Sequence, residues 1–255
     1  MVIILHNFFV ENSAKHGNCY LIDGADFNHI INVLRMRIGD TFLVSESGAC
    51  HLCSLRSIEA ESVIAEIIEE NFQDTELPVK IYLFQGLPKN DKMELIIQKA
   101  VELGVFAVIP VEMNRCVVKL DDKKKKSKTA RWQAISESAA KQSKRTVIPE
   151  VFDAMPYKKA VDMASELDML IVPYESKNGM AETIEVLSDI GKCKSVGIII
   201  GPEGGFEENE ISLALDKGGR IVSLGKRILR TETAAITAVS MCMLHTEMNS
   251  DGEQQ

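Results

Sequence analysis

The chain has 255 residues, of which 45% are hydrophobic and 26% charged, the composition of an ordinary globular protein. This length exceeds the usual size of one domain, so we expect two. No apolar run approaches the ~20 residues of a membrane span, and the first residues lack the basic leader of a signal peptide, so a cytoplasmic protein is expected. The formal net charge of −8 at pH 7 argues against an RNA partner unless basic residues gather on one face.

Short strands are predicted for the first seventy residues. β-forming segments separated by turn signals lie at residues 41–44, 49–55 and 63–68. The segment is acidic, because residues 1–73 hold four Lys or Arg against ten Asp or Glu. If this segment binds RNA, a local group of basic residues must make the contacts, and this group would be His29, Arg35 and Arg37.

The six cysteines are expected to be reduced, as is usual in a cytoplasmic chain of this size. Cys50 and Cys53 form a C-x-x-C pair, which can begin a zinc site. The sequence offers no two further ligands at similarly close spacing. We therefore expect no metal, and alternation along a strand explains the pair better.

After a boundary expected at residues 72–78, strand and helix patterns alternate. Apolar, β-branched strands are predicted at residues 79–85, 105–111, 168–172, 196–200 and 220–224. Helices are predicted at residues 91–103, 128–144, 157–166 and 232–248, with a further helix start near 207. Gly104 follows the first of these helices as its C′ residue. Strands of this kind suit a parallel sheet that helices cover on both faces.

Basic residues cluster in the middle of the chain. Residues 119–131 hold seven Lys or Arg against Asp121 and Asp122, and Lys141, Lys144 and Arg145 continue the tendency on the following helix. A solvated loop is the ordinary explanation of a lysine run. A basic face on an otherwise acidic protein is the alternative, and it would be sufficient for RNA binding.

Two glycine-bearing turns, at residues 201–205 and 224–233, each follow a predicted strand and lead into a predicted helix. Ligands of α/β sheets bind at such carboxyl ends of strands, where helix N-termini offer free N–H groups. Neither turn fits the P-loop or the G-x-G-x-x-G fingerprint. The first alone could be an ordinary tight turn. The second places two cations, an anion and two hydroxyls around a helix start, which a plain turn does not require.

Together the two turns resemble those of the SPOUT superfamily of RNA methyltransferases, and within it the RsmE family, which methylates N3 of a uridine in 16S ribosomal RNA. The resemblance extends over most of the chain. Further matching segments, in the order of the family, are Phe8-Phe9-Val10, His29 to Met36 ("H-VLRM"), Lys99 to Val105 ("KA-ELGV"), Arg131-Trp132, and Glu137 to Arg145 ("EAAEQS-R").

The resemblance implies a fold and a domain plan. Residues 1–72 would form a small PUA-like β-barrel that binds RNA, residues 73–249 a SPOUT α/β domain, and residues 250–255 a disordered tail. SPOUT domains thread their last helix through a loop to form a trefoil knot. Within the last helix, residues 234–239 are apolar on nearly every side, which suits either the buried core of a monomer or a homodimer contact. In one departure, Asn7 stands where the family usually has an arginine, which weakens the case for phosphate binding there.

The resemblance also implies a cofactor, S-adenosylmethionine. Its site would be formed by Pro173, Gly201, Glu203, Gly204, Gly205, Leu224, Gly225, Ile228 and Leu229. Methyl transfer needs little beyond in-line placement, but N3 of uracil carries a proton, so a base or a stabilising cation is required. Arg230 is the expected cation, and Glu232 is expected to orient or accept the proton. A structural ion pair of these two residues is the alternative.

The implied partners are 16S ribosomal RNA, in the assembled small subunit, and a second copy of the chain. The residues expected to bind RNA are His29, Arg35, Arg37, Lys123, Lys124, Arg131, Arg145 and Arg227. Three other functions stay open: a SPOUT enzyme acting on transfer RNA or on a ribose of 23S ribosomal RNA, a non-catalytic protein of ribosome assembly, and a transferase for a small molecule.

Overall fold

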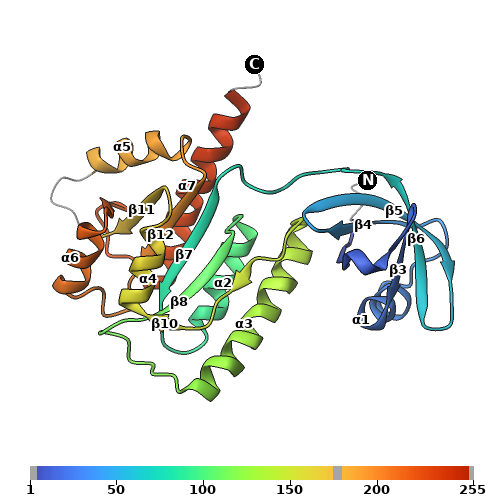
Figure 1. Ribbon diagram of the computed structural model, residues 1–255, viewed down its shortest axis with the longest axis horizontal. Coiled ribbons are helices and arrows are strands. Elements are labelled where there is room, and N and C mark those ends of the chain that lie inside the picture. Colours follow the sequence, from blue (N-terminus) through green and yellow to red (C-terminus); the bar gives the residue numbers. More distant parts are fainter. Residues whose placement is uncertain (1–4, 175–179, 253–255) are drawn as a thin grey trace. The chain divides into compact units, whose positions relative to one another are not determined.

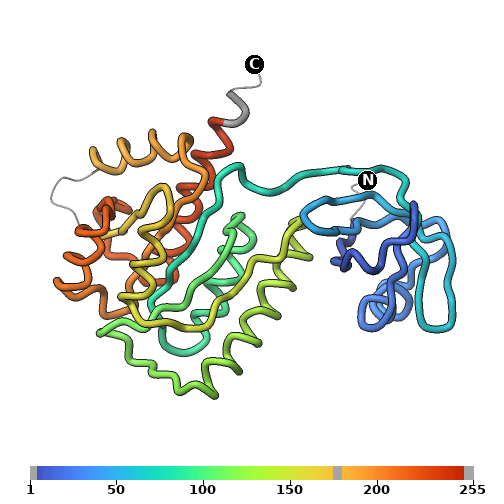
Figure 2. Tube along the Cα trace, viewed as in Figure 1, coloured from blue at the N-terminus to red at the C-terminus, as the bar shows by residue number. Residues whose placement is uncertain are grey.

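The computed structural model describes residues 5–174 and 180–252, with side chains to residue 249. The chain divides into two compact units. One takes in Met1–Glu76 and Ala140–Ile148, and the other Leu77–Ala139 and Pro149–Gln255. Figures 1 and 2 trace both along the chain. The expected domain boundary at residue 72 stays a prediction, and the short segment Ala140–Ile148 belongs with the first unit although it lies far along the sequence.

The first unit is one curled, six-stranded sheet in the order β1-β4-β5-β6-β3-β2. Its pairings are antiparallel except for β1, which lies parallel to β4. The strands are β1 (Asn7–Phe9), β2 (Lys15–His16), β3 (Cys19–Asp23), β4 (Thr41–Glu46), β5 (Ala49–Ile58) and β6 (Ser62–Glu69). A short helix α1 (Gly24–Asn28), the helical turn η2 (His29–Val33) and a 3-10 turn η1 (Asn12–Ala14) complete it.

Alternation explains how this sheet forms a core. Phe42, Val44, Cys53 and Leu55 are among the fully buried side chains that gather on one side of the sheet. The three predicted strands are confirmed as β4, β5 and β6, each with somewhat different ends. Strands β1, β2 and β3 are additional, because they are too short or too polar to stand out as alternating segments.

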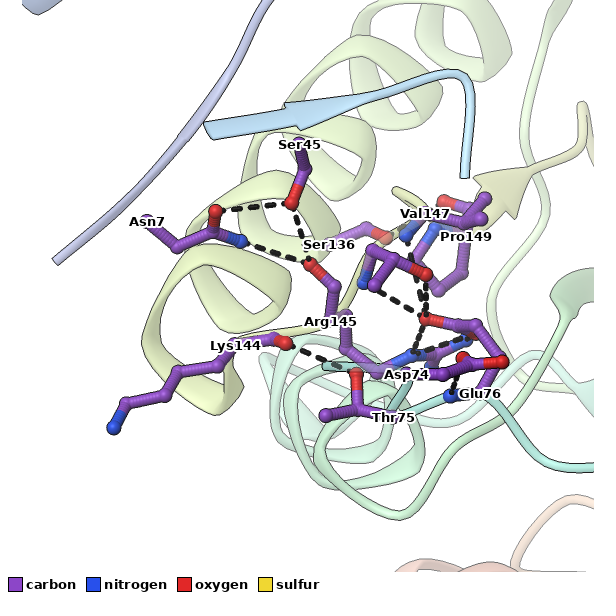
Figure 3. A network of polar contacts seen from close by, with 11 residues as sticks. Asn7, Ser45, Asp74, Thr75, Glu76, Ser136, Lys144, Arg145, Val147 and Pro149 are labelled. Atoms are coloured by element: carbon purple, nitrogen blue, oxygen red, sulfur yellow. Dashed lines mark hydrogen bonds and ion pairs between the residues drawn. The ribbon is translucent and has the colours of Figure 1, made fainter. Parts of the chain in front are cut away.

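The first unit contains a buried polar cluster, which includes Asn7, Ser45, Glu76 and Arg145 (Figure 3). The Asn7 side chain is 4% exposed, its Nδ2 donates to the Arg145 carbonyl at 2.8 Å, and its Oδ1 accepts from Ser45 Oγ at 3.0 Å. Arg145 Nε donates to both oxygens of Glu76, at 3.0 and 3.1 Å. Glu76 Oε1 also accepts from the backbone of Thr146 at 2.9 Å.

This cluster corrects one expectation and accounts for another. Arg145 was expected to bind RNA, but its side chain is 3% exposed and its guanidinium is paired with Glu76, so it is not available at the surface. Asn7 holds the carbonyl of the same residue. An amide that both donates and accepts suits this buried position, where a phosphate-binding arginine would have no access to RNA.

The second unit is built on a parallel sheet in the order β10-β8-β7-β12-β11-β13, with β9 also paired to β8. Its strands are β7 (Lys80–Gly86), β8 (Ala107–Glu112), β9 (Glu150–Val151), β10 (Met155–Pro156), β11 (Met169–Pro173), β12 (Ser195–Ile200) and β13 (Arg220–Val222). The inner strands β7 and β12 are almost wholly buried, as expected for a parallel sheet with helices on its faces.

Helices cover this sheet. α7 packs with α2 against β7 and β12, while α4 packs with α6 and against β8. The helices are α2 (Lys92–Glu102), α3 (Asp122–Ser143), α4 (Tyr157–Ala164), α5 (Ala181–Ile190), α6 (Glu208–Asp216) and α7 (Thr231–Gly252). Gly104, with φ +89°, ends α2 as expected.

The predicted α/β architecture with an N-terminal PUA-like sheet is confirmed, and several details differ. α3 begins at Asp122, so the lysine run is helical and not a loop. α5 was not predicted, because its sequence lacks clear capping signals. α7 reaches Gly252, so the first residues of the tail expected to be disordered are helical, and 253–255 lie outside the described residues. The knot stays a prediction.

Candidate functional site

The two glycine-bearing loops lie at one edge of the second sheet. Because neighbouring strands run parallel, their carboxyl ends meet there, with Ile200 of β12 beside Gln85 of β7 and Pro173 of β11 beside Val222 of β13. The loop at residues 201–205 follows β12. The loop at residues 224–233 follows β13, and residues 231–233 at its end form the start of α7. This is the edge where α/β sheets bind ligands.

The first loop is a tight turn that packs against the Phe206 ring. The Gly205 N–H donates to the Pro202 carbonyl at 2.9 Å, and Gly205 has φ +69°, a conformation that favours glycine. A Cβ on Gly201 would lie 3.2 Å from the Phe206 ring, so only glycine fits without displacing it. Gly204 is held from the other side, because Arg115 Nη1 donates to its carbonyl at 3.0 Å.

The second loop leaves apolar surface uncovered. Gly225 has φ +103°, and Ser223 before it exchanges hydrogen bonds with the Thr183 hydroxyl, at 2.8 and 3.2 Å. Ile228 is 98% exposed, while Leu224 and Leu229 are half-buried. The Ile228 side chain is therefore available to contact a ligand at this edge of the sheet.

Thr231 joins the two loops. Its hydroxyl donates to the Gly201 carbonyl at 2.6 Å and accepts from Gln85 Nε2 at 2.9 Å. Gln85 is fully buried, and its Oε1 has no hydrogen-bond partner within the described part of the chain. The N-terminus of α7 is thereby fixed to the carboxyl ends of β7 and β12, and Gln85 Oε1 is left there without a hydrogen bond from any described residue.

Lys92, in the first turn of α2, bridges the acidic groups of both loops. Its Nζ lies 3.1 Å from Glu203 Oε1 and 3.2 Å from Glu232 Oε2. Glu203 Oε1 also accepts from the Lys89 N–H at 3.1 Å. The Glu232 side chain is 14% exposed, while those of Lys92 and Glu203 are 28% and 27% exposed. One ammonium group therefore connects three elements of the site.

The charges of this cluster are fixed by their neighbours. The hydrogen bond to Glu203 raises the pKa of Lys92 above its ordinary value, and Glu232 adds to the shift. Burial favours a higher pKa for Glu203, but the backbone N–H groups and Lys92 outweigh it, so the pKa of Glu203 is lowered. At neutral pH Lys92 is an ammonium that donates hydrogen bonds and cannot serve as a base.

Three charged residues expected at the site, Glu203, Arg230 and Glu232, differ in their contacts. Glu203 was expected at the cofactor, but its carboxylate is engaged by Lys92 and the Lys89 N–H. Arg230 is exposed just before α7. Glu232 pairs with Lys92, so the alternative of an Arg230–Glu232 ion pair is not what the structure contains.

Sequence reasoning missed Lys92, Gln85 and Thr231 as parts of the site. A signal existed for the first two. The positive end of the helix dipole lies at the N-terminus, so a lysine in the first turn is unfavourable unless acidic groups compensate its charge. A glutamine at the end of an otherwise apolar, buried strand requires hydrogen-bond partners.

The basic residues expected to bind RNA are exposed, apart from Arg145. In the first unit these are His29, Arg35 and Arg37, and in the second Lys123, Lys124, Arg131 and Arg227. Arg131 Nη2 lies 2.9 Å from Glu94, although its side chain is 59% exposed. Lys123, Lys124 and Arg131 all lie on α3, so the lysine run presents its charge from a regular helix.

Two groups have a bearing on other functions. Cys50 and Cys53 are buried free thiols, and burial raises the pKa of Cys53 to about 12. Among residues 5–174 and 180–252, no three or more His, Cys, Asp or Glu side chains gather as a metal would require. Within the same residues, no helix has the length and apolar character needed to cross a membrane.

Comparison with known proteins agrees with this geometry. Residues 75–243 match the family described as an RNA methyltransferase domain, and residues 22–68 match the RNA methyltransferase PUA domain. The chain is 39% identical, over 96% of its length and 98% of the relative's, to ribosomal RNA small subunit methyltransferase E of Bacillus subtilis. The chain belongs to the methyltransferase E family.

Other members of the family extend the agreement. The methyltransferase E of Mesomycoplasma hyopneumoniae is 34% identical over 94% of this chain and 99% of its own. The structure of the Neisseria gonorrhoeae enzyme, bound to S-adenosyl methionine, is similar with a TM-score of 0.80 and 33% identity, covering 93% of this chain and 96% of that one. The resemblance found in the sequence is thus confirmed, and the chain is an RNA methyltransferase.

Proposed function

We propose that the protein transfers a methyl group from S-adenosylmethionine to N3 of a uridine in 16S ribosomal RNA, in the assembled small subunit. The observation that carries this proposal is the joining of the two glycine-bearing loops, through Thr231 and through Lys92. Relatives across the family carry the name of a small-subunit ribosomal RNA methyltransferase. A cytoplasmic location follows from that substrate.

The loops fit the proposed cofactor. Open space lies beside Gly205, where an added Cβ would meet no atom within 4 Å, and the exposed side chain of Ile228 offers an apolar surface for adenine. The residues proposed to surround it are Pro173, Gly201, Gly204, Gly205, Leu224, Gly225, Ile228 and Leu229, with Glu203 holding the first loop through Lys92. When bound, S-adenosylmethionine supplies an activated methyl group on a sulfonium.

The protein's own residues must then deal with the proton on N3. Lys92 and Arg230 are cations at the start of α2 and α7, and either can stabilise negative charge as it develops on the uracil oxygens. Glu232, held by Lys92, is proposed to orient the base or to accept the proton. Because the Glu232 carboxylate is already engaged by Lys92, we give the larger role to the cations.

RNA is proposed to bind along the exposed basic residues. In the second unit the proposed RNA contacts are Lys123, Lys124 and Arg131 of α3 and Arg227 of the second loop. In the first unit they are His29, Arg35 and Arg37. Phosphate contacts by such residues supply most nucleic-acid affinity. The overall charge of −8 is no obstacle when basic groups are local.

A second copy of the chain is proposed as the other partner. Ile184 of α5 is 65% exposed, and Leu244 and Met248 of α7 are 54% and 73% exposed. α5 and α7 pack against each other, so these side chains lie on one helical pair. Apolar surface of this kind suits a self-complementary homodimer interface.

Arg230→Ala tests the proposed chemistry. The variant is expected to cut methylation of small ribosomal subunits at least ~10-fold, because a charge-stabilising cation is lost, while leaving cofactor binding largely intact. Tritium transfer into subunits from a methylation-deficient strain measures the first, and calorimetric titration with S-adenosylmethionine the second. Lys226→Ala is the control for charge in the same loop.

Nucleoside analysis of the labelled RNA identifies the product. N3-methyluridine in 16S ribosomal RNA is the expected result. A methylated ribose, or label in transfer RNA or 23S ribosomal RNA, would assign the protein to another RNA. Normal turnover of Arg230→Ala would remove that residue from the catalytic group.

A further inference from the structure

A hollow of about 190 Å³ lies in the second unit, beside the segment that connects β7 to α2. Its volume is below the ~300 Å³ at which pockets for drug-sized ligands begin, so it suits a group the size of one nucleobase. No residue of the two glycine-bearing loops lines it. The lining residues are Leu87, Pro88, Asn90, Asp91, Met93, Val118, Leu120, Lys128 and Trp132.

The floor and walls of the hollow are apolar. Leu87, Met93 and Trp132 are buried, with exposed fractions of 2%, 2% and 4%. Val118 and Leu120 form a half-buried wall. A flat, apolar ring fits such a surface, because aromatic and aliphatic side chains both pack against the face of a base.

The rim of the hollow carries three different polar groups: an amide, a carboxylate and an ammonium. Asn90 is exposed and has φ +56°, a left-handed conformation that asparagine tolerates. Asp91 stands at the N-cap of α2, yet its side chain makes no capping hydrogen bond. Amide and carboxylate groups of this kind read the edge of an unpaired base, while the ammonium of Lys128 suits a phosphate.

Charge continues from the hollow along α3. Lys125 pairs with Glu112 and Arg131 with Glu94. Lys123, Lys126 and Lys128 have no acidic partner among the residues that the structure describes. Lys128 therefore places an uncompensated ammonium at the rim of an apolar hollow, with Lys123 and Lys126 elsewhere on the same helix, a combination that complements a nucleotide and not an apolar peptide segment.

The hollow is also connected to the reaction site. Asn90 and Asp91 line it, and the residues on either side of them, Lys89 and Lys92, both contact Glu203. Lys92 contacts Glu232 as well. A ligand in the hollow would thus contact Asn90 and Asp91, which are the sequence neighbours of Lys89 and Lys92 at the reaction site.

We propose that this hollow is a subsite for one unstacked base of the RNA, a neighbour of the nucleotide that is methylated, with its phosphate on Lys128. The proposal rests on the proposed function in requiring an RNA substrate. Enzymes that modify a base in RNA also contact the nucleotides that flank it, and binding one of these in the hollow would hold the strand in register. It would also favour substrates with the right nucleotide at that position.

Trp132 is the chain's one tryptophan and reports directly on the hollow. We expect titration of the full chain with a mixed-sequence single-stranded RNA octamer to change Trp132 emission in a saturable manner. Retention of labelled octamer on nitrocellulose measures binding independently. Binding to RNA without any change in Trp132 emission would overturn the proposal.

Two pairs of variants locate the effect. Val118→Phe fills the hollow, and its control is Val117→Phe, because Val117 is 69% exposed and does not line it. Lys128→Gln removes the ammonium at the rim, and its control on the same helix is Lys126→Gln. We expect Val118→Phe and Lys128→Gln to raise the KM for small subunits about tenfold relative to their controls, the scale of one stacked base. Calorimetric affinity for S-adenosylmethionine should stay unchanged.

The outcomes separate this proposal from the proposed function. If both lining variants methylate with unchanged KM, the hollow is not a base subsite even though the enzyme works. If wild-type protein methylates no ribosomal RNA but the octamer still changes Trp132 emission, the subsite stands and the proposed function fails. If Trp132 responds to RNA-free ribosomal proteins and not to the octamer, the hollow accepts a protein segment and the proposal is wrong.

Discussion

One ion-pair cluster of the first unit, Arg145 with Glu76, can be compared with one of the second, Lys92 with Glu203 and Glu232, because the two differ in how deeply the cation is buried. In the first unit Arg145 is 3% exposed and meets a carboxylate, Glu76, that also accepts from backbone N–H groups. In the second, Lys92 is shared between Glu203 and Glu232 and is 28% exposed. The first cluster has no capacity for a ligand, whereas the second is open to one.

Burial decides what each cluster can do. A buried ion pair is costly to break, because the remaining partner is left as an uncompensated charge. A partly exposed pair contributes little to stability, since water screens it and solvates whichever partner is left. We infer that the Glu76–Arg145 cluster stabilises the fold and that the Lys92 cluster organises the site.

Glu76→Gln should give the largest effect on stability. The change keeps the shape of the side chain but removes the negative charge with which the buried guanidinium of Arg145 is paired, and breaking a buried ion pair in this way typically costs about 3–5 kcal/mol. Chemical denaturation followed by circular dichroism measures it. The affinity of the folded protein for S-adenosylmethionine should remain that of the wild type.

The matched control is Asp162→Asn, the same carboxylate-to-amide change in an exposed pair. Asp162 and Lys217 are 2.7 Å apart, with side chains 45% and 42% exposed. We expect little change in stability from it. Equal destabilisation by both variants would show that burial does not distinguish these ion pairs.

Lys92→Met should show the opposite pattern, with a large loss of activity and little loss of stability. Without the ammonium, Glu203 and Glu232 are no longer held together, and misplacement of a catalytic group by about 1 Å can cost on the order of 10²-fold in rate. Measurements of kcat, of KM for both substrates and of Tm separate this effect from unfolding. Lys92→Arg, which keeps the charge, should recover part of kcat.

A drop in Tm that accounts for the whole loss of activity would assign Lys92 to the fold and remove the contrast between the clusters. Unchanged kcat in Lys92→Met would have the same consequence for the proposed site.

Most of the fold could be predicted from the sequence, because hydrophobic periodicity and local composition depend on residues that lie near one another in the chain. β7, β12 and α2 lie where apolar runs and the glycine at 104 placed them. α3 starts earlier than predicted, because a lysine run was given the properties of a loop, although lysine has good helix propensity. α5 has a weak pattern and was missed.

The site could be predicted only in part, for a related reason. The glycine-bearing turns carry their own signal, since a positive φ such as that of Gly225 restricts which residue can stand there. Lys92 meets Glu203 and Glu232 from over a hundred residues away, and spacing in the sequence says nothing about such a meeting. Arg145 shows the converse, because a basic residue at the end of a basic helix looked exposed and is buried.

Asn7→Ala should give a smaller loss of stability than Glu76→Gln. It removes the shorter hydrogen bond to the buried Arg145 carbonyl and the acceptor for Ser45, which leaves that carbonyl with the longer contact from Ser45 Oγ at 3.5 Å, at a cost of about 1–3 kcal/mol. Denaturant titration measures the loss. Asn12→Ala, which removes an exposed acceptor for Ser47, should stay within about 0.5 kcal/mol of the wild type. Similar losses in the two variants would contradict the importance given to burial.

The smallest predicted effect is on the acid dependence of stability. Burial favours a raised pKa for Glu76, but Arg145 and the backbone N–H groups outweigh it and hold the pKa below the ordinary value of 4.5. The folded protein therefore binds this proton less readily than the unfolded chain does. The stabilisation from Glu76 is complete above pH 4.5 and is lost as the pH falls below that value, through the lowered pKa of the folded state. Free energies of unfolding for wild type and Glu76→Gln should thus converge as the pH falls below 4.5, because only the wild type loses this contribution. If the difference in unfolding free energy between the two proteins stayed constant as the pH falls, another carboxylate would govern the loss of stability in acid.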